Sequence, residues 1–276
     1  MSQPIYIDIN CDMGESYGCW TLGRDEEVMP HITSANIACG FHGGDPHVMR
    51  RTVEQAMRHG VAIGAHPGLP DLMGFGRRRM EISPAELKDD HRYQVGALWA
   101  FAKAAGVRLQ HVKPHGIQYH MFEENLLLAQ AAAEQVVELD AELILMTMAM
   151  TKYDAKAREV KGLRVAAEGF ADRVYADDGQ LVSRKLGRDA LIPDPAKAAD
   201  QAVRMVMEGK VRTITGKVIG LKIETICIHG DTPGADKIVA AVREALAKAG
   251  AIVKPLRDWM PRGAGQLSSA SPAVSS

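Results

Sequence analysis

The chain has 276 residues, of which 46% are hydrophobic and 24% are charged, so it can bury a full core and keep a polar surface. Its 33 basic and 34 acidic residues leave a formal net charge of −1. That balance argues against nucleic-acid and membrane partners, because surfaces that bind nucleic acids or anionic membranes need a basic excess.

Short apolar runs alternate with longer helical patterns along most of the chain. The runs that predict strands lie at residues 5–10, 35–38, 61–65, 109–112, 142–146, 163–167 and 225–228. The helical patterns lie at residues 46–59, 84–105, 125–138, 195–208 and 235–248. Asp45 and Ser83 stand before prolines that open two of these patterns, which is typical of a capped helix start.

This alternation predicts a parallel sheet with right-handed crossovers. About seven strand–helix units favour a closed or nearly closed β/α barrel, with an open doubly wound sheet as the alternative. We expect one barrel domain over residues 1–257 and a disordered tail over 258–276, where Gly, Ser, Ala and Pro dominate. Residues 175–193 break the alternation, so we expect a long loop or small hairpin over the barrel mouth.

The ends of the chain and its cysteines indicate the compartment. The first residues lack the basic and apolar stretches of a signal peptide, and no window approaches the ~20 apolar residues that span a bilayer. The four cysteines form no C-x-x-C pair and are expected to be reduced thiols, largely buried. We therefore expect a cytoplasmic protein.

The first predicted strand carries an unusual line of polar residues. Asp8, Asn10 and Asp12 alternate with apolar residues, so a regular strand would place all three on one face. Polar groups on a buried strand are costly unless they have partners. We interpret them as part of a functional site; the alternative is a turn in which Asn10 and Asp12 cap the next segment.

Later strands repeat one pattern, in which an apolar run ends in a histidine followed by glycine or proline. The histidines are His42, His66, His115 and His229, and Lys113 precedes His115. Glu168 ends the sixth predicted strand directly. Because the carboxyl ends of parallel strands meet at one end of a barrel, we expect these side chains to converge there.

Such a set of carboxylates, imidazoles and a lysine provides general acids and bases. No serine or cysteine lies on a nucleophile elbow, and the glycines match neither a Walker loop nor a dinucleotide-binding motif. Two interpretations of the residues stay open. In one, a metal ion held by histidines and an aspartate activates water; in the other, the pocket works without metal by proton transfer and charge complementarity.

Seven sequence blocks, spread in order over nearly the whole chain except its tail, resemble the LamB/YcsF family of lactam-utilisation proteins. The blocks are residues 8–15 (DINCDMGE), 34–42 (SANIACGFH), 63–67 (IGAHP), 74–78 (GFGRR), 112–116 (VKPHG), 168–173 (EGFADR) and 227–231 (CIHGD). The resemblance implies the irregular seven-stranded parallel β/α barrel of the glycoside hydrolase and deacetylase type. It also implies the role of the A-type subunit in a 5-oxoprolinase that opens the lactam of 5-oxoproline to L-glutamate. Two further subunits, of B and C type, would supply the ATP-linked part.

The strand-end pattern and the resemblance together define the predicted site. The expected catalytic residues are Asp12, His42, His66, Lys113, His115, Glu168 and His229. The expected substrate-binding residues are Asp8, Asn10, Asn36, Arg77, Arg173 and Asp231. No metal is required by this set; a divalent metal, if present, would be held by Asp12, His66 and His115.

The expected roles follow from charge and position. Asp12 or His66 would act as the base towards water, Lys113 and His115 would stabilise charge on the reacting carbonyl or a phosphoryl group, and Glu168 would protonate the leaving nitrogen. Arg77 or Arg173 would hold the substrate carboxylate.

One stretch departs from the family pattern. After residues 113–116 the family usually continues Ala-Leu-Tyr-Asn, whereas this chain has Ile117, Gln118, Tyr119 and His120. Gln118 and His120 are expected beside the pocket, so the substrate could be another lactam or cyclic amide. The alternatives to the family's activity are a stand-alone metal-dependent deacetylase or amidohydrolase, and a non-catalytic regulator that binds a small anionic metabolite.

Overall fold

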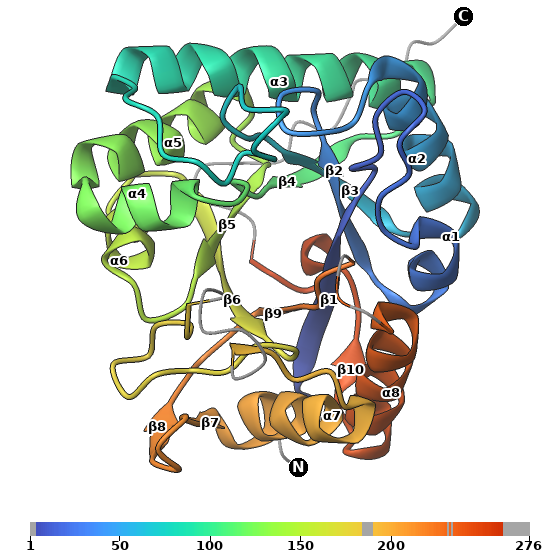
Figure 1. Cartoon of the computed structure of the whole chain (residues 1–276), viewed down its shortest axis with the longest axis vertical. Coiled ribbons are helices and arrows are strands. Elements are labelled where there is room, and N and C mark those ends of the chain that lie inside the picture. The colour runs from blue at the N-terminus through green and yellow to red at the C-terminus, as the bar shows by residue number, and fades with distance from the viewer. Residues whose placement is uncertain (1–3, 184–189, 231, 233, 262–276) are drawn as a thin grey trace, which may run out of the picture.

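A computed structural model describes residues 4–183, 190–230, 232 and 234–261 (Figure 1). Seven parallel strands form a closed barrel: β1 (Tyr6–Met13), β2 (Ser34–Ala38), β3 (Ala62–His66), β4 (Leu109–Val112), β5 (Ile144–Met148), β6 (Arg164–Phe170) and β9 (Thr225–Cys227). The barrel closes because β9 pairs with both β6 and β1, with Thr225 in register with Glu168 and Asp8. The predicted seven-stranded barrel is confirmed, and the open sheet is wrong.

Helices surround the strands (Figure 1). The five that the sequence predicts are α2 (Pro46–Arg58), α3 (Pro84–Ala104), α5 (Leu126–Leu139), α7 (Pro195–Val203), which continues as a π-helical turn over Arg204–Glu208, and α8 (Ala235–Lys248). The predicted caps are present, since Asp45 accepts from two backbone N–H groups and Ser83 forms a capping box with Glu86.

Several short helices and strands are not predicted from the sequence, because elements of one or two turns show too little hydrophobic periodicity. They are α1 (Asp25–Val28), α4 (Gln118–Glu124), α6 (Lys152–Arg158), the 3₁₀ turns Met29–His31 and Leu256–Asp258, the hairpin of β7 (Lys210–Arg212) and β8 (Val218–Gly220), and β10 (Ile252–Val253) beside β1. Of these, α4 matters most for function, because it begins directly after the predicted strand-end residues of β4.

The expected loop over residues 175–193 contains short antiparallel bridges, which join Arg173 to Leu191 and Tyr175 to Leu181. It is therefore partly a hairpin; residues 184–189 lie outside the described part of the chain.

Near the C-terminal end of the described residues, Trp259 stacks on Tyr6 with 6.0 Å between ring centroids, so packed structure continues past the boundary predicted at residue 257. The predicted tail over 262–276 also lies outside the described residues.

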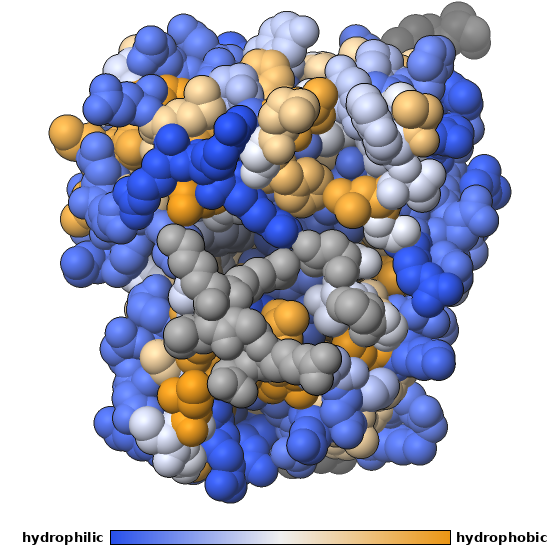
Figure 2. Space-filling model, viewed as in Figure 1, coloured by the Kyte–Doolittle hydropathy of each residue, from blue (hydrophilic) through white to orange (hydrophobic). Residues whose placement is uncertain are grey.

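The surface agrees with the balanced composition. On the face seen in Figure 2, hydrophilic side chains prevail and apolar ones form small separate groups. Among the described residues, the helices are all too short or too polar to cross a membrane.

The interior of the barrel admits little extra volume on the side of β3 and β4. A Cβ atom added to Gly64 in β3 would lie 2.0 Å from Nε2 of His111 in β4. That distance is far inside van der Waals contact, and His111 is fully buried. Gly64 is therefore present to make room for the imidazole beside it.

We predict that Gly64→Ala lowers the free energy of unfolding by about 1–3 kcal/mol, because the added methyl group overpacks the barrel interior. Gly96→Ala is the matched control: Gly96 lies on the exposed face of α3, and its added Cβ would meet nothing within 4 Å. That control is expected to stabilise by about 0.5–1 kcal/mol, since glycine is a poor helix former. Chemical denaturation of the three proteins measures both effects; an equal response of the two variants would contradict the packing argument.

Candidate active site

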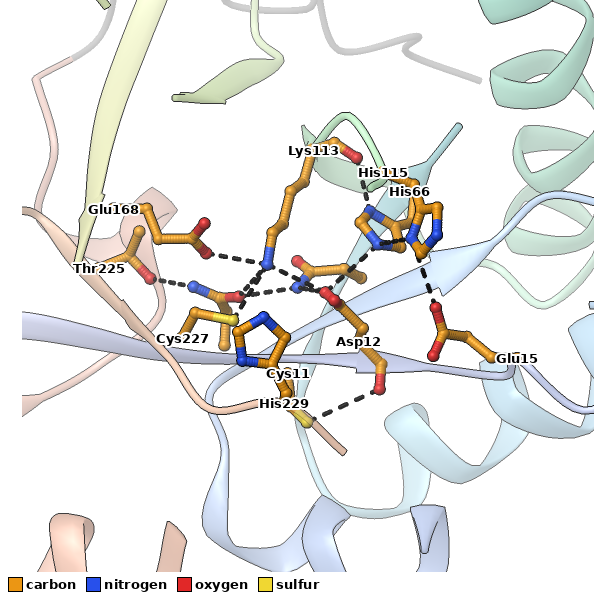
Figure 3. Close-up of polar contacts among 12 residues, drawn as sticks. Cys11, Asp12, Glu15, His66, Lys113, His115, Glu168, Thr225, Cys227 and His229 are labelled. Carbon is orange, nitrogen blue, oxygen red and sulfur yellow. Dashed lines mark hydrogen bonds and ion pairs between the residues drawn. The ribbon is translucent and has the colours of Figure 1, made fainter. Parts of the chain in front are cut away.

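The predicted strand-end residues do converge at the carboxyl end of the barrel. They come from six strands or from the residues directly after them: Asp12 (β1), His42 (β2), His66 (β3), Lys113 and His115 (β4), Glu168 (β6) and His229 (β9). Figure 3 shows Lys113 between Glu168 and Asp12, with His66 and His115 on the far side of Asp12.

Lys113 is a buried ammonium group, with 2% of its side chain exposed, and it lies between two carboxylates. Its Nζ is 3.0 Å from Oδ1 of Asp12 and 2.9 Å from Oε1 of Glu168, and it also donates to Asn10 Oδ1 at 3.2 Å. Burial alone would lower the pKa of Lys113, but the neighbouring Asp12, Cys227 and Glu168 raise it well above its ordinary value. Lys113 is therefore a permanent cation.

Asp12 is correspondingly a permanent carboxylate. Burial alone would raise its pKa, but His66 and Lys113 hold the pKa of Asp12 well below its ordinary value. Its Oδ1 also accepts from Asn36 Nδ2 at 2.8 Å. A carboxylate held this firmly is a poor proton acceptor, so Asp12 serves mainly to position Lys113.

The polar residues below Lys113 form a buried hydrogen-bonded network and do not line the pocket. Asn36 Nδ2 donates to Asn10 Oδ1 at 2.7 Å, and Asn10 Nδ2 donates to Thr225 Oγ1 at 2.7 Å. Thr225 Oγ1 in turn donates to Asp8 Oδ2 at 2.5 Å. Burial raises the pKa of Asp8 to about 6 despite hydrogen bonds from hydroxyl groups. The expected alignment of Asp8, Asn10 and Asp12 is present, but Asp8, Asn10 and Asn36 support the site from beneath.

Three histidines and one glutamate form a second cluster on the other side of Asp12. His42 stacks on His115 with 3.6 Å between ring centroids, and His42 Nε2 is 3.2 Å from Glu15 Oε1. His115 Nδ1 is 3.0 Å from His66 Nε2. One ligand atom from each of Glu15, His42, His66 and His115 lies within 4.8 Å of the others, so this cluster could hold a metal ion. It contains two of the three residues predicted for a metal, with Asp12 Oδ1 3.4 Å from His66 Nε2.

His229 forms a hydrogen-bonded pair with Asp172, a residue outside the predicted set. His229 Nδ1 lies 3.0 and 3.1 Å from the two carboxylate oxygens of Asp172, which also accepts from Thr232 Oγ1 at 2.9 Å. Burial would raise the pKa of Asp172, but the contact with His229 lowers it, so the group is a carboxylate. The carboxylate orients the imidazole and leaves Nε2 for the pocket, an arrangement that suits general acid–base chemistry.

A cavity of about 350 Å³ opens above these groups, which is within the usual size of a small-molecule site. Its lining includes Asp12, His66, Arg77, Lys113, His115, Tyr119, His120, Arg173 and His229. The lining contains neither His42 nor Glu168. Glu168 is fully buried, and its Oε2 accepts from the hydroxyl of Tyr119 at 3.3 Å, so Tyr119 stands between Glu168 and the cavity.

The two arginines predicted to bind the substrate carboxylate, Arg77 and Arg173, make different contacts. Arg77 is exposed at the cavity wall, with its guanidinium 4.9 Å from the centre of the Phe75 ring. Arg173 is buried and donates to the backbone carbonyls of Val182 and Ala190, so it ties down the loop over the barrel mouth. Both arginines line the cavity, and of the two Arg77 is the exposed one.

Of the three residues that depart from the family pattern, Ile117 and His120 border the cavity. Gln118 is buried, and its Oε1 lies 3.3 Å from Nε2 of His91 in α3. The expectation that Gln118 lies beside the pocket is therefore wrong; α4 turns that side chain towards α3. Asp231, predicted to bind substrate, lies outside the described residues.

Sequence reasoning missed Glu15, Tyr119 and Asp172. Glu15 and Asp172 were visible in the family-like blocks, but neither ends a strand directly. Tyr119 comes four residues after His115, in a helix that the sequence did not predict. All three reach the site through turns or side-chain contacts, which strand periodicity does not describe.

Comparisons with known proteins find relatives over nearly the whole chain. Residues 7–261 match the model of the LamB/YcsF family. The A-type subunit of 5-oxoprolinase from Pyrococcus abyssi is 51% identical over 255 residues, which are 92% of this chain and 99% of that protein. The protein of the same name from Alkaliphilus metalliredigens is 52% identical over 242 residues, 88% of this chain and 94% of that protein.

Solved structures show the same fold. The lactam utilization protein of Thermus thermophilus superposes with a TM-score of 0.85 at 47% identity, covering 91% of this chain and 99% of that one. A candidate cellobiose-phosphate cleavage protein of Enterococcus faecalis superposes with a TM-score of 0.54 at 13% identity, covering 93% of this chain and 99% of that one. That second likeness concerns the barrel alone.

We predict that Lys113→Met lowers the free energy of unfolding by about 3–5 kcal/mol, because it leaves the buried carboxylates of Asp12 and Glu168 without their cation. Adding Glu168→Gln should recover part of this loss, since one buried charge is then removed. Lys88→Met is the control: Lys88 pairs with Glu134 and Glu138 near the surface and should cost about 1 kcal/mol or less. Denaturant titration of the four proteins measures the differences; a double variant no more stable than Lys113→Met would contradict the charge argument.

Proposed function

The chain belongs to the LamB/YcsF family, and from this we propose that it is the A-type subunit of a 5-oxoprolinase, which hydrolyses the lactam of 5-oxoproline to L-glutamate. The observation that carries the proposal is the match, at 49–52% identity and over nearly their full length, to relatives with that name. The cavity supports it, because a small anionic lactam needs a cation for its carboxylate and acid–base groups around its carbonyl.

ATP and partner subunits complete the proposal. The relatives are named as one component of a larger enzyme, which implies further subunits; we propose two, of B and C type. An amide is a poor electrophile, and this sequence has no Walker loop, so ATP-linked activation of the lactam would take place with the partners. In the hydrolysis, a water oxygen bonds to the lactam carbonyl carbon, the carbon–nitrogen bond breaks, and the nitrogen takes up a proton. Such a reaction and the four free cysteines suit the cytoplasm.

Within this reaction, we assign the base to His229 and not to Asp12 or His66. The Nδ1 of His229 is held by Asp172, so Nε2 is positioned to take a proton from the attacking water. Asp12 is already held by Lys113, and His66 is engaged with the histidine cluster. Lys113 would then stabilise negative charge that develops on the carbonyl oxygen or on a phosphoryl group.

The leaving nitrogen would receive its proton from His229, after that imidazole has taken it from the water, because the hydroxyl hydrogen of Tyr119 is donated to Glu168. Burial raises the pKa of Tyr119 well above its ordinary value, helped by the negative charge of Glu168. The phenol therefore stays protonated and borders the cavity, whereas Glu168 lies behind it. Arg77 would hold the substrate carboxylate from the cavity wall.

We predict that the chain forms glutamate from 5-oxoproline only together with its two partner subunits and ATP.

A second prediction concerns Arg77. Arg77→Met should raise KM for 5-oxoproline about tenfold or more, but leave turnover of 2-pyrrolidinone, which lacks the carboxylate, unchanged. The matched control is Arg79→Met, because Arg79 pairs with Glu124 away from this cavity. Glutamate release, measured on 5-oxoproline and a panel of other lactams, provides the readout.

Two outcomes would contradict the proposal. Hydrolysis by the isolated chain without ATP would indicate a stand-alone amidohydrolase, an alternative that the metal-capable cluster of Glu15 and three histidines favours. Binding of 5-oxoproline without turnover, even with all partners and ATP, would indicate a regulator.

We further predict that His229→Gln lowers kcat by about 10²–10⁴-fold, because the positioned base is lost. Asp172→Asn should lower kcat with little change in KM, since it removes only the group that orients His229. His47→Gln, at an exposed position on α2, should leave kcat unchanged. A parallel loss of kcat and thermal stability in both variants would assign the pair a structural role instead.

A further inference from the structure

The histidine cluster contains two ring nitrogens that face each other. His66 Nδ1 lies 2.6 Å from the backbone carbonyl oxygen of Lys113. A carbonyl oxygen can only accept, so Nδ1 must carry the hydrogen. In the neutral ring that a bound metal ion requires, the other nitrogen of His66, Nε2, carries a lone pair; without such an ion, a proton on Nε2 would face Asp12 Oδ1 at 3.4 Å.

The same argument applies to His115, with the roles of the two ring nitrogens exchanged. His115 Nε2 lies 2.8 Å from the backbone carbonyl oxygen of Phe75, so Nε2 carries the hydrogen and Nδ1 carries the lone pair. Phe75 has a φ of 56°, a left-handed conformation that is rare for an aromatic residue, and Gly76 follows with a φ of 62°. In this left-handed turn the Phe75 carbonyl oxygen faces His115.

These two lone pairs point into one small space. His115 Nδ1 and His66 Nε2 are 3.0 Å apart, a distance at which two acceptors repel unless a positive charge lies between them. Further acceptors border the same space, since Glu15 Oε1 is 3.5 Å from His115 Nδ1 and Asp12 Oδ1 is 3.4 Å from His66 Nε2. The arrangement calls for a cation.

The spacing fits a metal ion. Ligand atoms bound tetrahedrally at ~2.0 Å lie about 3.3 Å from one another. Three of the separations in the cluster are 3.0, 3.5 and 3.2 Å, the last between His42 Nε2 and Glu15 Oε1, and all four ligand atoms lie within 4.8 Å of one another. Backbone carbonyls fix the remaining N–H of His66 and of His115, which are usual outer contacts of metal-binding histidines, whereas Nδ1 of His42 has no hydrogen-bond partner among the described residues. A set of three imidazoles and one carboxylate suits zinc and similar first-row ions better than magnesium or calcium, which prefer oxygen ligands.

A shared proton is the competing explanation, and the surroundings oppose it. A proton would join only His66 Nε2 and His115 Nδ1, whereas the cluster brings four ligand atoms within 4.8 Å of one another. The ammonium of Lys113 is shared between the carboxylates of Asp12 and Glu168. A divalent ion would add more compensating positive charge beside Asp12 than one proton.

We propose that Glu15, His42, His66 and His115 bind one first-row divalent cation of the zinc type at the inner wall of the cavity. His66 and His115 border the cavity, so the ion would be accessible to a substrate carbonyl or a water molecule. Its use there, to polarise that carbonyl or lower the pKa of that water, rests on the proposed function. This four-residue set replaces the triad expected from the sequence, since Asp12 Oδ1 is already engaged with Lys113 and Asn36.

The test is a titration of the chelator-treated full-length chain with Zn²⁺ by calorimetry, with the absorption of bound Co²⁺ as a second readout. We expect one ion per chain and a raised Tm on binding. Glu15→Gln and His42→Gln should each weaken Zn²⁺ binding at least tenfold and abolish the rise in Tm. His91→Gln should bind as tightly as the wild type, because His91 is equally buried but pairs with Gln118 on α4.

The wild-type chain binding none of Zn²⁺, Co²⁺, Mn²⁺ and Ni²⁺ would overturn the site, and so would unchanged affinity in Glu15→Gln and His42→Gln. Full turnover by the metal-free chain with its partners would overturn the catalytic use of the ion. Stoichiometric Zn²⁺ binding without any 5-oxoproline turnover in the complete complex would support the site while refuting the proposed function.

Discussion

The buried ammonium of Lys113 is the interaction on which the rest of the site depends. Lys113 leaves β4, crosses the barrel interior, and reaches Asp12 on β1 and Glu168 on β6. An unpaired charge in this place would be prohibitively costly, so the lysine and its carboxylates can only be buried together. With β9 paired to both β6 and β1, the closed barrel brings both acids within reach of one lysine.

Two backbone carbonyl groups orient the histidines near Lys113. The carbonyl of Lys113 itself directs one nitrogen of His66, and the carbonyl of Phe75 directs one nitrogen of His115. Neither group is identifiable from side-chain type, yet together they decide which nitrogens carry lone pairs. Asp172 orients His229 in the same manner with a carboxylate. The site thus has a histidine–glutamate cluster suited to a cation and a His229–Asp172 pair suited to proton transfer.

Strand periodicity and strand-end position predicted most of this site. The alternation in β1 correctly placed Asp8, Asn10 and Asp12 on one face, and the recurrent histidines correctly marked the ends of β3, β4 and β9. The same reasoning could not tell residues that border the cavity from residues beneath it. Asn36 and Asp8 lie in the buried network, whereas Tyr119 borders the cavity from α4, because depth along a barrel axis depends on strand register and tilt.

The sequence by itself determined the barrel, the end of the barrel that carries the site and the family of the protein, because local periodicity and contiguous motifs encode these directly. Only the tertiary structure decided which groups act together: that Asp172 serves His229, that Gln118 faces His91 and leaves the cavity wall to His120, and that Glu15 joins the three histidines. These pairings join residues far apart in the chain, and hydrogen-bond direction and charge compensation are fixed only when the barrel closes and excludes water.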